Sequence, residues 1–229
     1  MTLAVKKALT KLASTALFER ELYFIGGTAL AYYLCHRISE DVDIVSPKKL
    51  PYKEIESAML SLGAVKQKDI YESALRINGL NPSEYMLKFL LDDVKVEFFA
   101  ASTNIMKSII DKAMLQRYEP TSIKMLDLKS ISKLKLIALL NRIKSRDIYD
   151  LNEIIKSKIL SLDEILYLCM EVKKITTSQE LIRFIENMQE KDDDEIVYLD
   201  EKFPIALNFK ELQKELIENI GRYFTNNSL

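Results

Sequence analysis

Short apolar runs and stretches of helical spacing alternate along the first hundred residues. Apolar or alternating runs of this length predict strands, here expected at 22–25, 42–45, 70–78, 84–91 and 94–100. Helical spacing predicts helices over residues 1–20, from Thr28 to about His36, and from Pro51 to Leu62. The alternation predicts an α/β (α+β) domain in which helices flank a mixed sheet.

From about residue 105 the pattern is helical almost to the last residue, with interruptions near Pro120 and Pro204. A length of 229 residues suits one large or two small domains. We therefore predict an α/β domain over residues 1–107 and a mainly helical domain over residues 108–229.

Two of the five glycines, Gly26 and Gly27, follow the first predicted strand. Glycine allows a positive φ and removes side chains that would block a polyphosphate. Thr28 is expected to cap the following helix, whose first N–H groups and partial positive charge favour an anion. The turn predicts a phosphate-binding site, although a Gly-Gly pair by itself more often marks an ordinary turn.

Asp41 and Asp43 flank Val42 where the next predicted strand begins. Residues two apart on a strand point to the same face, so both carboxylates would meet one cation. The order of strand, glycine turn, helix and acidic strand resembles the nucleotidyltransferase superfamily typified by DNA polymerase β. In that superfamily a Gly-Gly or Gly-Ser turn precedes a pair of acidic residues separated by one hydrophobic residue.

Glu97 is the candidate for a third carboxylate, on the alternating segment Val94–Phe99. Lys95, Glu97 and Phe99 would share one face of that strand. A single Glu on a strand is most often only solvent-facing. Three carboxylates would suit Mg²⁺ (or Mn²⁺), which prefers hard oxygen ligands, and two such ions can hold the attacking and leaving oxygens of an in-line displacement.

Residues Leu134–Leu151 show helical spacing and carry several basic side chains. Taken as one continuous helix, this segment would place Lys135, Arg142 and Arg146 within about 20° of one line. This basic stripe predicts contact with phosphate. The alternative is a solvated helix face with local Arg–Asp pairs.

Together, these segments resemble the AbiEii family of nucleotidyltransferase toxins. The family pairs a Gly-Gly-Thr-Ala-Leu turn and an Arg-x-Ser-x-Asp-hydrophobic-Asp segment with a later helix that carries Lys, two Arg and two Asp. The residues that match these motifs are Gly26, Gly27, Thr28, Ala29, Leu30, Arg37, Ser39, Asp41, Asp43, Lys135, Leu136, Ala138, Leu139, Arg142, Arg146, Asp147, Asp150 and Leu151.

The resemblance implies that Ser39 contacts nucleotide phosphate and that Asp41 and Asp43 bind metal. It also implies that Lys135 and either Asp147 or Asp150 are required for activity. Nucleotide binding is expected of nine motif residues: Gly26, Gly27, Thr28, Arg37, Ser39, Arg142, Arg146, Asp147 and Asp150. The family often has Asp at the third acidic position, where this chain has Glu97.

Composition agrees with a globular protein, since 48% of the residues are hydrophobic and 29% are charged. The longest apolar stretch, Phe24–Cys35, is too short for a membrane span, and no signal peptide is apparent. We therefore expect a cytoplasmic protein without a membrane partner. Cys35 and Cys169 form no metal-binding spacing with His36 and are expected to be reduced, buried thiols.

Charge is unevenly distributed along the chain. Residues 109–158 hold 11 Lys and Arg against 6 Asp and Glu, a local charge of +5, and residues 159–229 hold 8 against 15, a local charge of −7. A basic middle could follow a nucleic-acid backbone. The acidic end argues against wide nonspecific duplex binding, and its densest run, 191–195, most simply predicts a solvated loop.

These features predict an enzyme that moves a nucleotide from a nucleoside triphosphate to an acceptor with the help of magnesium. In this interpretation Glu97 completes the metal site and is also the candidate base, and Lys135 with Arg146 neutralises the leaving pyrophosphate. The resemblance favours an RNA acceptor, especially the 3′ end of transfer RNA, and a cognate antitoxin. Two alternatives stay open: an enzyme that modifies a small molecule such as an aminoglycoside, and a regulator that binds nucleotide without catalysis.

Overall fold

The computed structural model describes residues 1–69, 72–189, 197–200, 203–205 and 208–226. The chain divides into two compact units, Met1–Asp127 and Leu128–Leu229.

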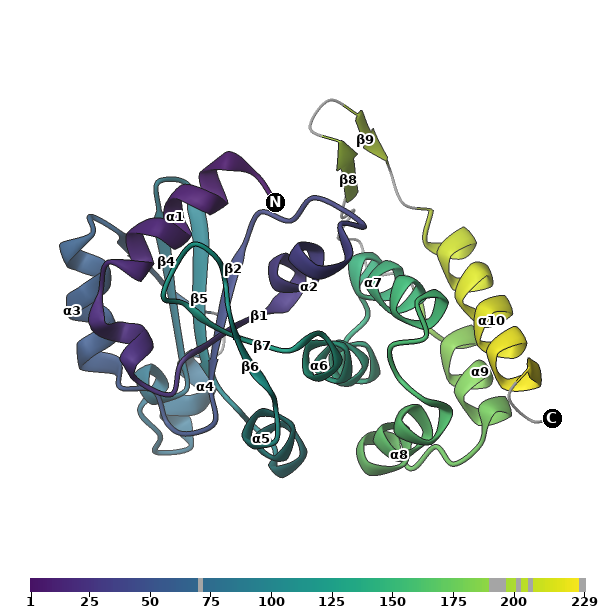
Figure 1. The fold of residues 1–229 in the computed structure, drawn as a ribbon. Coiled ribbons are helices and arrows are strands. Elements are labelled where there is room, and N and C mark those ends of the chain that lie inside the picture. Colours follow the sequence, from purple (N-terminus) through teal and green to yellow (C-terminus); the bar gives the residue numbers. More distant parts are fainter. Residues whose placement is uncertain (70–71, 190–196, 201–202, 206–207, 227–229) are drawn as a thin grey trace. The chain divides into compact units, whose positions relative to one another are not determined.

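The first unit is built on a seven-stranded sheet (Figure 1). Its strands lie in the spatial order β3, β4, β5, β2, β1, β7, β6. Their bounds are β1 Tyr23–Ile25, β2 Val42–Ser46, β3 Val65–Gln67, β4 Met86–Leu91, β5 Val94–Ala100, β6 Leu115–Arg117 and β7 Lys124–Leu126. β2 is parallel to β5 and β1 is parallel to β7, and the other neighbouring pairs are antiparallel. The mixed sheet expected from the sequence is confirmed.

Five α-helices and two short 3-10 helices of the described residues accompany this sheet. They are α1 Leu3–Ala13, η1 Ala16–Glu19, α2 Gly26–Leu34, α3 Tyr52–Ser61, α4 Glu72–Ile77, η2 Pro82–Glu84 and α5 Asn104–Asp111. α1 contacts β5, α2 contacts β1 and β2, and α3 contacts β3 and β4. These helices cover an apolar core that includes the fully buried rings of Phe24, Phe89 and Phe98.

The two faces of β5 differ as the sequence predicts. Val94, Val96 and Phe98 are buried, whereas Lys95 and Glu97 between them are partly exposed. A strand with this alternation buries one face against helices and turns its other face outward. Glu97 lies on this outward face, in register with Asp43 of β2.

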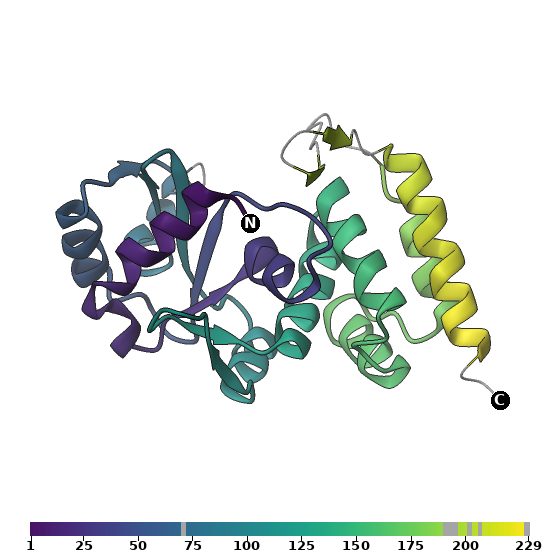
Figure 2. The ribbon, with the colours of Figure 1, turned by 45° about the horizontal axis from the view of Figure 1, so that its top comes forward.

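In its described residues the second unit is helical, apart from one pair of antiparallel strands. Its elements are α6 Leu128–Asn141, α7 Ser145–Lys156, α8 Leu162–Lys173, α9 Ser178–Glu186, β8 Val197–Asp200, β9 Phe203–Ile205 and α10 Phe209–Asn226. α6 packs against α7 and α8, and α10 packs against α7 and α9 (Figures 1 and 2). The prediction of a mainly helical second part is confirmed.

The boundary between the parts lies later than expected. The sequence placed it at 107/108, whereas the structure divides the chain at 127/128. The segment in between forms the hairpin of β6 and β7, and β7 pairs with β1 through Phe24 and Met125. Pro120 was read as an interruption between helices, but it lies in the turn that joins two strands.

Several element predictions were also wrong in detail. Residues 72–77 of the expected strand 70–78 form α4, while 70–71 lie outside the described residues. Ala74, Leu75 and Arg76 are good helix formers, so propensity outweighed the short apolar pattern there. The first helix ends at Ala13 instead of extending to residue 20. The helix expected to run to His36 ends at Leu34, because Cys35 adopts a left-handed conformation.

Two remaining predictions concern the cysteines and the acidic run. Cys169 is buried, which raises the pKa of its thiol to about 12, but Cys35 is exposed, so only one of the two expected buried thiols is found. The acidic run 191–195 lies outside the described residues.

Candidate active site

The Gly-Gly turn joins β1 directly to α2. Gly26 has a φ of +83°, and a methyl group built on its Cα would lie 2.0 Å from Oδ2 of Asp43. Asp43 also pairs with Ile25 across the antiparallel strands β1 and β2. Only a residue without a side chain allows the Asp43 carboxylate to approach the backbone this closely. The first glycine therefore positions a candidate metal ligand at the start of α2.

Gly27 makes room for two other side chains. A methyl group there would lie 2.4 Å from Nη2 of Arg37 and 3.2 Å from Oγ of Ser39. Arg37 is buried, with 6% of its surface exposed, and its Nη1 donates to the carbonyl oxygen of Ile38 at 3.2 Å. The second glycine thus brings the Arg37–Ser39 segment against the beginning of α2.

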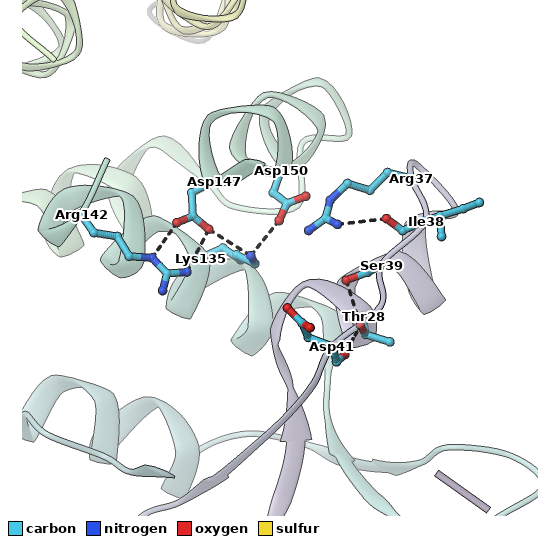
Figure 3. A network of polar contacts seen from close by, with 9 residues as sticks. All are labelled: Thr28, Arg37, Ile38, Ser39, Asp41, Lys135, Arg142, Asp147 and Asp150. Atoms are coloured by element: carbon cyan, nitrogen blue, oxygen red, sulfur yellow. Dashed lines mark hydrogen bonds and ion pairs between the residues drawn. The ribbon is translucent and has the colours of Figure 1, made fainter. Parts of the chain in front are cut away.

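Thr28 does not cap the helix as the sequence suggested. α2 begins at Gly26 after Ile25, and no side chain caps it. The Thr28 hydroxyl is fully buried, donates to Oγ of Ser39 at 2.9 Å and also contacts the carbonyl oxygen of Asp41 (Figure 3). Thr28 therefore holds the loop that carries Ser39 and Asp41, and its own hydroxyl is turned away from solvent.

The carboxylates of Asp41, Asp43 and Glu97, together the acidic row, lie on one face of the sheet at β2 and β5. Asp43 of β2 is opposite Glu97 of β5 in the parallel register, and Glu97 is opposite Lys88 of β4 in the antiparallel register. Neighbouring residues in register point to the same face of a sheet, so Asp43, Glu97 and Lys88 lie side by side. Asp41 precedes β2 by one residue and joins the same face through Lys95, as the ion pairs below show.

Two lysines neutralise part of this acidic row. Lys95 Nζ lies 3.4 Å from Asp41 Oδ2 and 3.3 Å from Glu97 Oε2. Lys88 Nζ lies 2.8 Å from Glu97 Oε1 and 2.7 Å from Asp69 Oδ2. Each oxygen of Glu97 therefore has one ammonium partner.

The ion pairs determine the charge of these groups. Burial by itself would raise the pKa of Glu97, but the hydrogen bond from Lys88 and the charge of Lys95 outweigh burial and hold this pKa below its usual value. Burial would lower the pKa of Lys95, yet the charges of Asp41, Glu97 and Asp43 raise it. Glu97 and Lys95 are therefore charged at neutral pH, and Glu97 is a poor proton acceptor.

The donor set on this face fits a hard divalent cation. Two aspartates and a glutamate supply only oxygen ligands, which is the chemistry that magnesium and manganese prefer. Within the described part of the chain no three acidic, His or Cys side chains are close enough to enclose an ion as they stand. Asp41 and Glu97 are both paired with Lys95 as they stand, so either could join an ion only after Lys95 leaves, and Glu97 would do so through the oxygen that Lys88 does not hold.

The basic stripe predicted on one long helix is wrong, because the segment forms two helices. α6 ends at Asn141, and Lys144 is the extended residue before α7, which starts at Ser145. Neither Gly nor Pro marks this break in the sequence, so helical spacing alone gave no sign of it.

The break folds Lys135 into a buried ion-pair network (Figure 3). Lys135 Nζ lies 3.1 Å from Asp147 Oδ1 and 2.7 Å from Asp150 Oδ2. Arg142 Nε donates to Asp147 Oδ2 at 2.8 Å and its Nη2 donates to Oδ1 at 3.3 Å. Lys135, Asp147 and Asp150 are all buried, while the Arg142 side chain is 55% exposed. The predicted alternative of local Arg–Asp pairs is thus present for Arg142.

This network keeps Asp147 ionised although it is buried. Burial would raise its pKa, but the charge of Lys135 and the hydrogen bond from Arg142 outweigh burial and lower the pKa. A buried charge without partners would be far more costly. Asp147 therefore links α6 and α7 electrostatically.

Sequence reasoning missed the roles of Lys88 and Asp69. Lys95 was placed on the correct face by the alternation of β5, but nothing in the sequence gives the register between β4 and β5. That register, which pairs Lys88 with Glu97, brings the second ammonium to the acidic row.

With the fold and these geometries in place, the class of protein is clear: it is a nucleotidyltransferase. Residues 7–220 match the model of the family described as nucleotidyl transferase AbiEii toxin, type IV toxin–antitoxin system. The chain belongs to the AbiEii family, and the resemblance noted in the sequence is confirmed. Membership implies a nucleoside triphosphate substrate and a cognate antitoxin.

Three solved structures resemble the chain at low sequence identity. JHP933 from Helicobacter pylori is 18% identical, with 97% of this chain and 90% of that chain covered and a TM-score of 0.49. A Helicobacter pylori protein described as a candidate nucleotidyltransferase is also 18% identical, with 97% and 92% covered and a TM-score of 0.52.

The third, the nucleotidyltransferase toxin MenT4 from Mycobacterium tuberculosis H37Rv, is 14% identical, with 96% and 85% covered and a TM-score of 0.48. Curated protein sequences gave no match. Among the described residues, no helix combines the length and apolar character that crossing a bilayer requires.

Proposed function

We propose that this AbiEii protein transfers a nucleotide from a nucleoside triphosphate to the 3′ end of an RNA, with transfer RNA as the acceptor, and that it requires magnesium or manganese. The observation that carries this proposal is the position of Asp43, whose carboxylate lies against Gly26 at the start of α2 and opposite Glu97 on the neighbouring strand. A polyphosphate approaching the glycine turn would meet the carboxylates that can hold its counter-ion.

In the proposed reaction the 3′ hydroxyl oxygen forms a bond to the α-phosphorus of the triphosphate. The bond from this phosphorus to the bridging oxygen breaks, pyrophosphate leaves, and the hydroxyl proton passes to solvent. The divalent ion, held by Asp41 and Asp43, would polarise the phosphate and stabilise the charge of the leaving group. The lowered pKa of Glu97 argues against its use as the base. We assign Glu97 instead to the positioning of the neighbouring carboxylates.

The backbone of the Gly-Gly turn, with Arg37 and Ser39 packed on it, is proposed to position the triphosphate. Hydrogen-bond donors at the start of α2 would favour phosphate oxygens. Thr28 supports this segment from beneath through its bonds to Ser39 and to the Asp41 carbonyl.

Lys135, Arg142, Arg146, Asp147 and Asp150 are proposed to serve the same reaction. In the structure, Lys135 forms ion pairs with two buried carboxylates, so its first role is to hold α6 and α7 together. We therefore assign Arg142 and Arg146 to the neutralisation of the negative charge on the leaving pyrophosphate.

The test combines labelled substrates with blocked acceptors. Purified protein is incubated with Mg²⁺, bulk transfer RNA and each labelled nucleoside triphosphate in turn. Label should enter the RNA, and prior oxidation of its 3′ diol with periodate should abolish labelling. Labelling of an aminoglycoside and of no RNA would instead establish the small-molecule enzyme, and labelling of neither, despite triphosphate binding, would establish the regulator.

The matched variants locate the chemistry. Asp41→Asn and Asp43→Asn remove one charge each without changing size, and both should lower labelling by orders of magnitude. Asp93→Asn is the control, because Asp93 is an exposed turn residue with a φ of +63° that asparagine tolerates. Equal labelling by all three variants would exclude the proposed centre.

RNA as the acceptor also predicts a strong effect of salt. Each phosphate contact on a single strand should lower log K by about 0.7 per decade of salt, because counter-ions are released on binding. The local charge of +5 over residues 109–158 supports such contacts. A filter-binding titration between low and physiological salt measures this slope.

A further inference from the structure

Lys95 lies between two of the acidic side chains that we assign to the divalent ion, Asp41 and Glu97. Its ammonium is 3.4 Å from Asp41 and 3.3 Å from Glu97, and Asp43 is in register with Glu97 on the next strand. The Lys95 side chain is 43% exposed, so it reaches the row from the solvent side. A single ammonium therefore occupies the space between the carboxylates that we assign to the divalent ion.

Lys88 is held differently. Its ammonium forms two shorter contacts, 2.8 Å to Glu97 and 2.7 Å to Asp69, and its side chain is 27% exposed. Asp69 has only 5% of its side chain exposed, which fixes the far end of this bridge. Lys88 is thus held by two short ion pairs, whereas Lys95 is more exposed and forms longer ones.

We propose that Lys95 is a tethered competitor of the divalent cation: it neutralises Asp41 and Glu97 until the ion arrives, and it must leave for the ion to bind. This role rests on the metal-dependent function proposed above. Lys88 stays in place and remains paired with one oxygen of Glu97. Its charge reduces the repulsion among the carboxylates. Lys95 thereby sets how tightly the protein binds the ion.

The physical reason is mutual exclusion. Two like charges a few ångströms apart repel strongly, and both species need the same carboxylate oxygens. The free energy of binding the ion therefore includes the loss of two ion pairs. Replacing the ammonium with an uncharged amide on a similar, slightly shorter side chain should abolish that loss and tighten binding of the ion.

The experiment measures Mn²⁺ binding directly on the full-length protein, without nucleotide, from the electron paramagnetic resonance signal of free Mn²⁺. Lys95→Gln should lower the dissociation constant roughly tenfold. Lys66→Gln is the matched control, because Lys66 lies on β3 of the same sheet, its side chain is 42% exposed, and it pairs with a single carboxylate, Glu56 of α3. Its dissociation constant should stay within about twofold of the native value.

A second variant separates charge from folding. Lys95→Arg keeps the positive charge and should retain the weak native affinity, so the difference between the Gln and Arg variants reports competition. An unchanged or weaker affinity in Lys95→Gln would overturn the proposed role, as would equal tightening by both variants.

The outcome is independent of the proposed transfer reaction. If the native protein labels RNA while Lys95→Gln binds Mn²⁺ no more tightly, only the competitor role fails. If Lys95→Gln binds Mn²⁺ more tightly but the native protein labels no acceptor, the competitor role stands and the transfer reaction fails.

Discussion

At the scale of single residues, the glycine turn makes room for neighbouring side chains of the protein as well as for a ligand. Gly26 admits the carboxylate of Asp43, and Gly27 admits Arg37 and Ser39. The sequence suggested glycine for the approach of phosphate. The structure adds a reason that is internal to the protein, because neither glycine could carry a methyl group without moving these neighbours.

Two glycines with nearly equal φ allow this effect to be measured. Gly63 has a φ of +80° with no atom within 4 Å of an added methyl group, whereas Gly26 has a φ of +83° and the Asp43 contact. Gly63→Ala should cost about 1 kcal/mol from backbone strain alone. Gly26→Ala should cost about 1 to 3 kcal/mol more from overpacking and should also weaken Mn²⁺ binding by moving Asp43.

Urea unfolding and Mn²⁺ titration of the two variants make the comparison. Equal losses of stability, with unchanged Mn²⁺ binding in both, would contradict the contact between Gly26 and Asp43.

At the scale of elements, α6 and α7 are held together by buried charge. Lys135 on α6 bridges Asp147 and Asp150 on α7, and Arg142 closes the network from the connecting segment. A buried ion pair contributes little net stability when intact, but removing one partner leaves an uncompensated charge. The activity of a Lys135 variant therefore cannot be interpreted without its stability.

Lys135→Met should lower the free energy of unfolding by about 3 to 5 kcal/mol, because it leaves Asp150 buried without its lysine partner. Arg142→Met should cost about 1 kcal/mol or less, since the side chain is 55% exposed. Adding Asp150→Asn to Lys135→Met should restore part of the loss, which a double-mutant cycle by urea unfolding measures. Strictly additive losses would mean that the pair is not coupled.

A second element, the start of α8, gives a pH-dependent prediction. Glu164 forms ion pairs with Lys129 and Lys133 and accepts a hydrogen bond from the backbone N–H of Ser161. Burial opposes ionisation, but Lys133, Ser161 and Lys129 outweigh it and lower the pKa of Glu164 from 4.5 to about 2.

Because the folded pKa lies below the unfolded one, Glu164 stabilises the protein above pH 4.5, and this contribution is lost as the pH falls towards about 2. At pH 7 the free energy of unfolding should be larger for the native protein than for the Glu164→Gln variant. The difference should shrink below about pH 4.5. Urea midpoints across this range test it, with the exposed Glu171→Gln as the control whose difference should not change in the same way.

At the scale of the whole molecule, the division at 127/128 follows from sheet pairing. The hairpin of β6 and β7 completes the sheet beside β1, and Ile123, Met125 and Leu126 are buried there. A boundary at 107 would remove two strands and uncover this apolar surface.

A fragment of residues 1–127 should therefore fold cooperatively, whereas a fragment of residues 1–107 should not. Loss of the hairpin would leave β1, a three-residue strand, at an open edge of the sheet. Dispersed amide resonances and a sigmoidal urea transition in the longer fragment alone are the expected result. Cooperative folding of the shorter one would contradict the boundary.

The sequence by itself determined the elements with strong local signals. The alternation of Val94–Phe99 gave β5 and its two faces, and the turn at Gly26-Gly27 with the following Asp41 and Asp43 gave the family and the class of enzyme. These features depend on periodicity and on residue types close together in the chain, so they can be read without knowing the fold.

The tertiary structure alone decided what depends on contacts between distant residues. Pairing of β7 with β1 moved the boundary, and the break at Arg142–Lys144 turned a predicted basic stripe into a buried network around Lys135. The register of β4 on β5 brought Lys88 to Glu97. Strand register and the burial of charge arise from packing over long sequence separation, and no local pattern encodes them.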